Sequence, residues 1–240
     1  MNKFKIFTRY YLSKIPKLYF LFYHLNEKFF KKKKFIKFKL KKNMDFLIDG
    51  FPRSGNTYAY FAFLHMQKKK YKIIHHFHHE YGILYAILTN IPNMILIRKP
   101  DDAVKSLLIR NKNLDHDDAF LMYYIYYKIV YNYRQSLLII KFESIINNFN
   151  YCVNQVNLRF KTNFIKKKIS AKDKKKIFKK IDLSSSHHSF NHNKKINKKN
   201  LITLSARPFK KRNLIKISIK KNYWRNKAYK IYYLLNNISK

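Results

Sequence analysis

The chain has 240 residues, with 53 Lys and Arg against 12 Asp and Glu, and its formal net charge is +41. Hydrophobic residues make up 47% and aromatic residues 18%, which is enough for one sizeable core and excludes a globally disordered chain. A single cysteine, Cys152, excludes a disulfide framework and a zinc site built from cysteines. The charge favours anionic partners such as nucleotides, nucleic acid or an anionic membrane surface.

Residues 1–43 mix lysines with aromatic side chains and are predicted to form an arm that precedes a folded domain at 44–240. The longest apolar stretch of the arm is interrupted by His24 and is far shorter than the roughly 20 residues that span a bilayer. Two interpretations stay open: a solvated basic leader with a few residues docked on the core, or a segment lying on a membrane surface. The free cysteine and the lack of a recognisable signal predict a cytoplasmic protein, with the arm as its potential membrane contact.

From residue 44 onward, short apolar runs alternate with helical patterns. The predicted strands cover residues 44–49, 71–74, 93–97 and 137–142. The predicted helices between and after them cover residues 57–67, 81–88, 101–110, 119–135 and 143–160. This alternation predicts a three-layer α/β fold in which helices flank a central parallel sheet.

The last third of the chain has a different character. Residues 166–180 are predicted to form a lysine-rich helix, residues 184–200 a polar loop, and residues 223–238 a closing amphipathic helix. The basic stretch 207–212 is interpreted as a charged loop, with a role in covering a bound nucleotide as the alternative. We therefore divide the domain into a nucleotide-binding core at 44–150 and a variable part at 151–240.

The loop after the first predicted strand has the composition of a phosphate-binding loop. Residues 50–58 read Gly-Phe-Pro-Arg-Ser-Gly-Asn-Thr-Tyr between a strand and a helix, where backbone N–H groups can point at an anion. Gly55 allows close approach of the backbone, and Arg53 supplies a cation with several donors. The Lys of a Walker A loop is missing after Gly55, which argues against a P-loop kinase or ATPase. An ordinary strand-to-helix turn is the alternative.

A second segment, at residues 93–110, places polar groups at the end of another strand. Arg98 closes the predicted strand, and Asp102 and Ser106 follow in the first turns of the next helix. Arg98 and Ser106 can therefore face one anion at the carboxyl end of the sheet, where ligands bind in open α/β folds. Asp102 is interpreted as a helix cap rather than a ligand.

Together these two segments resemble the sulfotransferases that use 3′-phosphoadenosine 5′-phosphosulfate (PAPS). The sequence Pro-Arg-Ser-Gly-Asn-Thr at 52–57 is similar to their 5′-phosphosulfate loop, and Arg-x-Pro-x-Asp-x-x-x-Ser at 98–106 is similar to their 3′-phosphate motif. The two motifs occur in the order of the family, and the resemblance covers about residues 44–150. It implies a P-loop NTPase-like sulfotransferase fold.

The resemblance also implies roles for individual residues. The 5′-phosphosulfate would be held by Arg53, Ser54, Gly55, Asn56 and Thr57. Tyr58 stands where many members carry a Trp that stacks on adenine, and an aromatic ring can share that role. Arg98 and Ser106 would bind the 3′-phosphate, and Arg53 would also stabilise charge on the transferring group.

A histidine cluster at 75–79 offers candidates for the general base. A hydroxyl acceptor must lose its proton, and histidine suits that task near neutral pH. His76 lies at about the family's spacing before Arg98, His78 is the second candidate, and His75 is a further competitor. We expect no metal, because no acid-plus-histidine set at ligand spacing completes a site. A basic surface loop rich in histidine is the alternative.

The sequence thus predicts a nucleotide-binding transferase: a PAPS-dependent sulfotransferase with adenosine 3′,5′-bisphosphate as its product. The acceptor would be a hydroxyl-bearing molecule, with a carbohydrate or glycolipid suggested by resemblance to bacterial members. Two other interpretations stay open. One is a basic nucleic-acid-binding protein, supported by the charge and the aromatic content. The other is an inactive protein that keeps the sulfotransferase fold.

Overall fold

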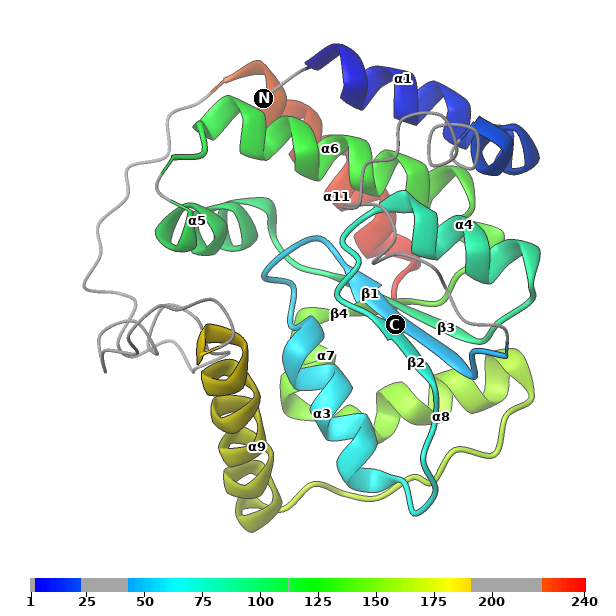
Figure 1. The fold of residues 1–240 in the computed structure, drawn as a ribbon, viewed down its shortest axis with the longest axis vertical. Coiled ribbons are helices and arrows are strands. Elements are labelled where there is room, and N and C mark those ends of the chain that lie inside the picture. Colours follow the sequence, from blue (N-terminus) through cyan, green and yellow to red (C-terminus); the bar gives the residue numbers. More distant parts are fainter. Residues whose placement is uncertain (1–2, 23–42, 112, 191–221) are drawn as a thin grey trace.

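The computed structural model describes residues 3–22, 43–111, 113–190 and 222–240, with residues 185–190 described by their backbone alone. Four parallel strands form one sheet in the order β2-β1-β3-β4. Their bounds are β1 Phe46–Gly50, β2 Ile73–His75, β3 Asn93–Ile97 and β4 Ile139–Lys141. In the register, Ile48 pairs with His75 of β2 and with Met94 of β3. The α/β class with an all-parallel sheet is therefore confirmed (Figure 1).

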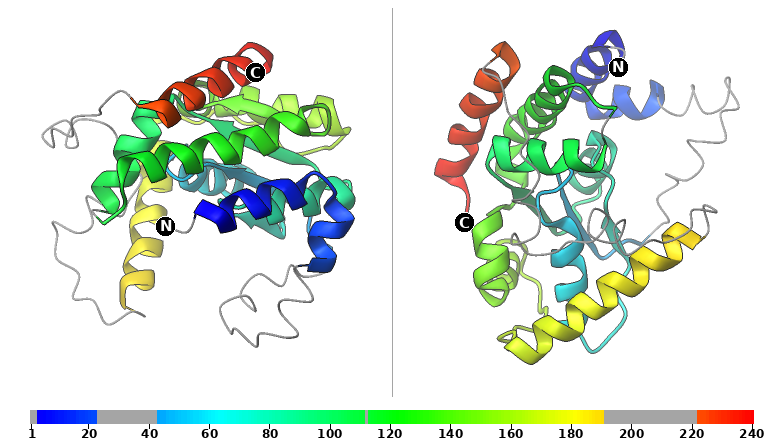
Figure 2. Two further views of the ribbon diagram at one scale, coloured as in Figure 1. Left: turned by 90° about the horizontal axis from the view of Figure 1, so that it is seen from above. Right: turned by 90° about the vertical axis from the view of Figure 1, so that its left-hand side faces the viewer.

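Helices cover both faces of the sheet and give three layers (Figures 1 and 2). One face packs on α3 Asn56–Met66, α7 Phe142–Asn147, α8 Phe149–Phe160 and α9 Ala171–Phe190. The other packs on α4 Glu80–Leu88, α5 Pro100–Arg110, α6 His116–Asn132 and α11 Tyr223–Ile238. In β1, Phe46 and Ile48 face the first layer while Leu47 faces the second. Both faces are covered, which explains why β1 and β3 are continuous apolar runs rather than alternating ones.

The largest differences between the predicted elements and the structure lie in the helices predicted at 143–160 and 166–180 and in the loop predicted at 184–200. The helix predicted at 143–160 is two helices, because the chain breaks at Asn148, whose side chain accepts from the Tyr151 N–H and caps α8. The helix predicted at 166–180 begins at Ala171, where the Ser170 hydroxyl accepts from the Asp173 N–H and donates to its carboxylate. That helix also continues through residues 184–190, which were predicted as loop; residues 191–200 of that loop, and the stretch 207–212, lie outside the described residues.

Residues 3–22 pack on the folded core. They comprise α1 Lys3–Ser13 and a helical segment at 16–22, and Figure 2 shows α1 running along α6. Arg9 makes two hydrogen bonds of 2.6 Å to the buried Glu80 carboxylate, and Tyr19 donates to the same carboxylate at 3.1 Å. Tyr133 donates to the Ser13 carbonyl at 2.6 Å. The remainder of the predicted arm, at 23–42, lies outside the described residues.

The C-terminal helix closes the second layer. α11 packs along α6, and Arg225 forms a bidentate ion pair with Asp101 at the start of α5, at 2.9 and 2.7 Å. Lys240 then exchanges backbone hydrogen bonds of 2.9 Å with the β4 residues Ile139 and Lys141. In the part of the chain that the structure describes, no helix combines the length and the apolar character needed to cross a bilayer.

Candidate anion-binding site

The candidate site lies at the carboxyl edge of the sheet, where the loops that follow β1 and β3 diverge; we refer to this point of divergence as the crevice. The chain leaves β1 toward α3 on one face of the sheet and leaves β3 toward α5 on the opposite face. Open parallel sheets bind ligands where neighbouring strands diverge in this way, because the two loops separate and leave a crevice. β2 and β4 end at the same edge of the sheet. The histidine cluster, which follows β2, and Phe142, which follows β4, therefore lie near it.

The loop after β1 is held in a fixed shape by its own side chains. The Asn56 amide donates to the Gly50 and Phe51 carbonyls at 3.3 and 3.1 Å. The Ser54 hydroxyl, fully buried, lies 3.2 Å from the Tyr127 hydroxyl. Gly55 precedes α3 with a φ of 95°, and a Cβ there would lie 3.1 Å from the Phe142 ring. Ser54 and Asn56 therefore shape the loop, and α3 begins directly after it, so that its first backbone N–H groups lie at this edge of the sheet.

Three helices begin at this edge without a side-chain cap. The residues at the N-cap positions of α3, α5 and α7, which follow β1, β3 and β4, are Gly55, Lys99 and Lys141, and none of these three makes a side-chain cap hydrogen bond in the described structure. By contrast, α4, α6, α8 and α11 are capped by His79, Asp115, Asn148 and Asn222. The N-terminus of a helix has the positive end of its dipole and unpaired N–H donors. The uncapped ends therefore concentrate positive potential and donors where the crevice opens.

Two arginines and a serine connect the two predicted motifs. Arg53 donates from Nε to the Ser106 hydroxyl at 3.0 Å, and Arg98 donates from Nη1 to the Arg53 carbonyl at 3.0 Å. Arg53 has a positive φ of 73°, which is uncommon for a residue other than glycine. The loop after β1 and the start of α5 are thus joined directly.

Arg98 is a buried cation. It is 7% exposed, its guanidinium lies 4.3 Å from the Phe142 ring centre, and among the described residues its Nε has no hydrogen-bond partner. Burial lowers the pKa of Arg98, while the charges of Asp102 and Glu143 act in the opposite direction. An arginine remains charged under these conditions, so the buried Nε–H favours an acceptor oxygen from a bound anion.

His76 and His75 form a hydrogen-bonded chain with the loop. His76 Nε2 lies 2.8 Å from the Thr57 hydroxyl, and its Nδ1 lies 2.5 Å from Nδ1 of His75. His75 stacks on Tyr60 with ring centres 3.8 Å apart, and burial lowers its pKa to about 4. His75 is therefore neutral at physiological pH and a poor general base there.

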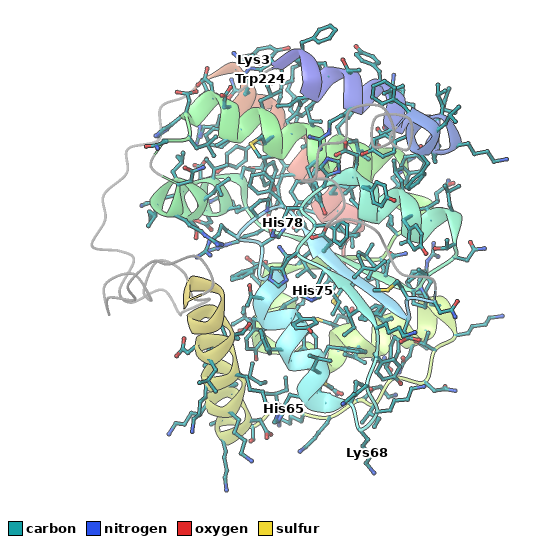
Figure 3. The ribbon with its side chains drawn as sticks, viewed as in Figure 1. Lys3, His65, Lys68, His75, His78 and Trp224 are labelled. Carbon is teal, nitrogen blue, oxygen red and sulfur yellow. The ribbon has the colours of Figure 1, made fainter. Side chains whose placement is uncertain are left out.

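His78 has the geometry of an oriented base. Its Nδ1 lies 2.8 Å from the Gly50 carbonyl, which can only accept, so Nδ1 has the proton and Nε2 is the basic nitrogen. The buried Asp49 carboxylate accepts the His78 backbone N–H at 3.0 Å and lies 3.4 Å from Nδ1. Burial acts to lower the pKa of His78, but the hydrogen bond and charge of Asp49 prevail and raise it. Figure 3 shows His75 and His78 near the end of α3 at which that helix begins.

The structure brings most of the predicted residues together at this edge, but it places Tyr58 elsewhere. Tyr58 is 3% exposed in the core between α3, α8 and α9, against the rings of Phe149 and Phe178. A ring in that position has no open face for a ligand, so we do not assign adenine stacking to it. Among the described residues, no group of three or more His, Cys, Asp or Glu side chains could hold a metal ion.

Several residues of the site were missed by sequence reasoning. Asp49 was counted as the end of a strand, although a carboxylate inside an apolar run is an unusual residue to bury. Phe142 was counted as the end of β4, yet its ring lies beside Gly55 and Arg98. Tyr123 donates to the Arg98 carbonyl at 2.6 Å, and Tyr127 to the Leu96 carbonyl at 2.7 Å. Their spacing of four along a helical pattern was a signal that these tyrosines share one face.

The chain matches no protein-family model, no curated protein and no solved structure in comparisons with each. The features that bear on function are therefore the geometry of this edge and the two motifs.

Proposed function

We propose that this chain is a sulfotransferase with a P-loop-like sulfotransferase fold, which moves a sulfuryl group from PAPS to an acceptor hydroxyl. The observation that carries the proposal is the Arg53–Ser106 hydrogen bond, with Arg98 bound to the Arg53 carbonyl. Two segments that each resemble one half of a PAPS site meet at one crevice. If the two similarities were accidental, the two segments would have no reason to lie in contact, yet they are joined by these hydrogen bonds.

We assign the two anionic groups of the nucleotide to the positively charged groups on either side of the site. We assign the 5′-phosphosulfate to Arg53, Thr57 and the backbone N–H groups at the start of α3, with Gly55 allowing the close approach. We assign the 3′-phosphate to Arg98 and Ser106 at the start of α5. The buried Nε of Arg98, which has no hydrogen-bond partner in the described part of the chain, supports this, because a phosphate oxygen would supply an acceptor.

The proposed reaction is an in-line displacement at sulfur. The acceptor oxygen forms a bond to sulfur while the bond between sulfur and the 5′-phosphate oxygen breaks, and adenosine 3′,5′-bisphosphate leaves. The hydroxyl proton passes to a histidine. Arg53 and the start of α3 stabilise the negative charge that develops on the sulfuryl group and the leaving oxygen.

Of the two candidate bases, the geometry favours His78. Its Nδ1 is held by the Gly50 carbonyl and Asp49, so the lone pair is fixed on Nε2 and the raised pKa brings its basicity toward neutral pH. His76 has both ring nitrogens in the chain from His75 to Thr57. We assign His76 the second role, which is to orient Thr57.

A transfer assay tests this proposal. The full chain is incubated with PAPS and a panel of carbohydrate, lipid and phenolic hydroxyl acceptors, and release of adenosine 3′,5′-bisphosphate is followed with and without each acceptor. We expect acceptor-dependent release that Arg53→Ala lowers by at least about a hundredfold. Release that no acceptor stimulates, from a protein that binds the nucleotide tightly, would indicate an inactive protein that keeps the site.

A second candidate function is binding of single-stranded nucleic acid. A shallow cavity of about 700 Å³ beside the start of α5 is lined by Lys99 and the α11 side chains Tyr223, Arg225, Asn226, Lys227, Tyr229, Lys230 and Tyr233. Cations mixed with exposed aromatic rings suit a phosphate backbone and stacked bases. Binding to an oligonucleotide that weakens steeply with salt and is lost in Lys99→Ala/Lys230→Ala would favour this function.

A further inference from the structure

We propose that the outer face of residues 3–22 lies on an anionic lipid surface. Of the fifteen exposed large hydrophobic side chains in the described residues, six lie between Phe4 and Phe22. Phe4 is 78% exposed, Ile15 58% and Leu21 56%. Large apolar side chains are otherwise exposed singly over a folded surface, so their concentration in one short segment indicates an interaction site.

The exposed residues share faces of the two helices. On α1, Phe4 and Tyr11 are seven residues apart, which places them on one side of the helix. In the segment 16–22, Leu18 and Leu21 are three residues apart and lie on a common face. Ile15 lies between the helices and continues the patch. We call Phe4, Tyr11, Ile15, Leu18 and Leu21 the outer face.

Neighbouring side chains fix α1 to the core. Ile6, Phe7 and Tyr10 pack against Leu121, Ile125 and Ile129 of α6. The ion pair of Arg9 with the buried Glu80 carboxylate also holds α1 on the core, while Phe4 and Tyr11 stay exposed beside this contact. Exposed apolar side chains lie in water unless a second apolar environment receives them.

The charges around the outer face select the kind of partner. Residues 3–22 contain no Asp or Glu, and Lys3, Lys14 and Lys17 are exposed. Apolar side chains flanked by lysines suit the boundary between acyl chains and acidic headgroups.

A lipid surface fits these features better than the other occupants. A second copy of this chain would bring the same lysines together, and like charges across an interface oppose association. A nucleic acid would satisfy the lysines and could stack on Phe4 and Tyr11. The other three side chains of the outer face, Ile15, Leu18 and Leu21, are aliphatic and offer bases no ring to stack on. The inference is independent of the proposed reaction, since it involves none of the residues at the crevice.

Flotation with lipid vesicles tests the inference on the full chain. The probes are vesicles of phosphatidylcholine alone and of phosphatidylcholine with phosphatidylserine. The test variant is Ile15→Ser/Leu18→Ser/Leu21→Ser. The matched control is Leu88→Ser/Leu158→Ser/Leu234→Ser, which removes three side chains that are 45%, 69% and 47% exposed on other helices. The single tryptophan, Trp224, lies 6.0 Å from the Phe7 ring, so its fluorescence reports whether α1 stays docked in each variant.

We expect the wild-type chain and the control to float with the acidic vesicles, and at least roughly tenfold less with phosphatidylcholine alone. The test variant should lose at least about tenfold in affinity for the acidic vesicles with its tryptophan fluorescence unchanged. Equal binding by the test variant and the control would overturn the proposal, and so would a lack of wild-type binding to acidic vesicles. A wild-type dimer that the test variant abolishes, without vesicle binding, would assign the face to a second copy instead.

Discussion

The side chain of Arg53 donates a hydrogen bond from Nε to the hydroxyl of Ser106 across 3.0 Å, although the two residues are 53 positions apart in the sequence. This contact exists because β1 and β3 are adjacent and parallel, so that the loops that follow them meet at one edge. The same adjacency brings Arg98 to the Arg53 carbonyl. The pairing of β1 and β3 thus brings their two loops together, and the residues of these loops supply the polar groups of the site.

Substitution of the proposed base should separate binding from chemistry. We expect His78→Ala to lower kcat for sulfuryl transfer by roughly 10²- to 10⁴-fold, because a general base typically contributes that much. The affinity for adenosine 3′,5′-bisphosphate should stay within a few fold of wild type. His76→Ala is the comparison variant, and steady-state kinetics with calorimetry on both decides the assignment. A larger kcat loss in His76→Ala than in His78→Ala would move the base to His76.

The pKa of His78 should depend on Asp49. In the wild-type chain we expect it above the usual value of about 6.5, and in Asp49→Asn below it, because burial then acts without the carboxylate. A raised histidine pKa stabilises the fold below the unfolded pKa, and this contribution is lost as the pH rises through the folded value. Histidine NMR titrations of both chains measure the shift. Identical His78 pKa values in the two chains would contradict the role of Asp49.

Acid should destabilise the fold through two other histidines. Burial lowers the pKa of His75 and of His79 to about 4. The unfolded chain binds protons at these groups near pH 6.5, so their contribution is present above that pH and is lost as the pH falls toward 4. We expect the free energy of unfolding to fall by on the order of 6 kcal/mol over this window, with about 3 kcal/mol from each histidine. Urea unfolding at a series of pH values measures it.

The matched variant for the acid effect is His79→Asn. Asparagine keeps a side-chain acceptor for the Tyr81 N–H that His79 caps, but it removes the titrating ring. The loss of stability between pH 6.5 and 4 should therefore become shallower. Glu80, whose pKa lies near 2 because the charges of His79 and Arg9 outweigh its burial, should lose its contribution only at still lower pH. An unchanged slope in His79→Asn would exclude this histidine as a source.

Two glycines should respond to alanine in opposite ways. At Gly50, a Cβ would lie 2.5 Å from the Leu96 carbonyl of β3, so Gly50→Ala must push the central strands apart and should cost roughly 2–3 kcal/mol. At Gly82 in α4, the nearest atom would be Phe77 Cγ at 3.4 Å, an ordinary contact. Gly82→Ala should therefore be neutral or stabilise the fold by about 0.5–1 kcal/mol. Urea midpoints with unchanged slopes test both, and equal effects would contradict the packing described.

The sheet was predictable because its strands are short apolar runs that end at polar residues, glycine or proline. Residues 93–97 are an apolar run closed by Arg98 and Pro100, and the strand has those bounds. Local signals also determined α11, which begins at Tyr223 after the cap Asn222. By contrast, the break at Asn148 and the start of α9 after Ser170 depend on caps that a lysine- and asparagine-rich sequence offers at many positions.

The site was predictable in its motifs and not in its side-chain contacts. The loop at 50–58 and the pair Arg98 and Ser106 are readable from spacing, because strand ends in parallel sheets share an edge. Whether a side chain points to the crevice depends on packing from distant elements. Tyr58 points into the core because Phe149 and Phe178 surround it, and Ser54 is turned toward Tyr127 of α6. The helices at 3–22 were missed because their lysines and aromatic residues are typical of the whole chain.

We expect the site formed by the loops after β1 and β3 to bind a nucleotide that has a 3′-phosphate. Calorimetry measures this by comparing the affinities for adenosine 3′,5′-bisphosphate and ADP. Arg98→Ala is the test variant, and Arg134→Ala, which removes an exposed arginine just before β4 and thus at the opposite edge of the sheet, is the matched control. We predict that the wild-type chain and the control bind the bisphosphate at least about tenfold more tightly than ADP, and that Arg98→Ala removes this preference. Equal, salt-sensitive binding of both nucleotides in all three chains would contradict the account and indicate a general cationic surface.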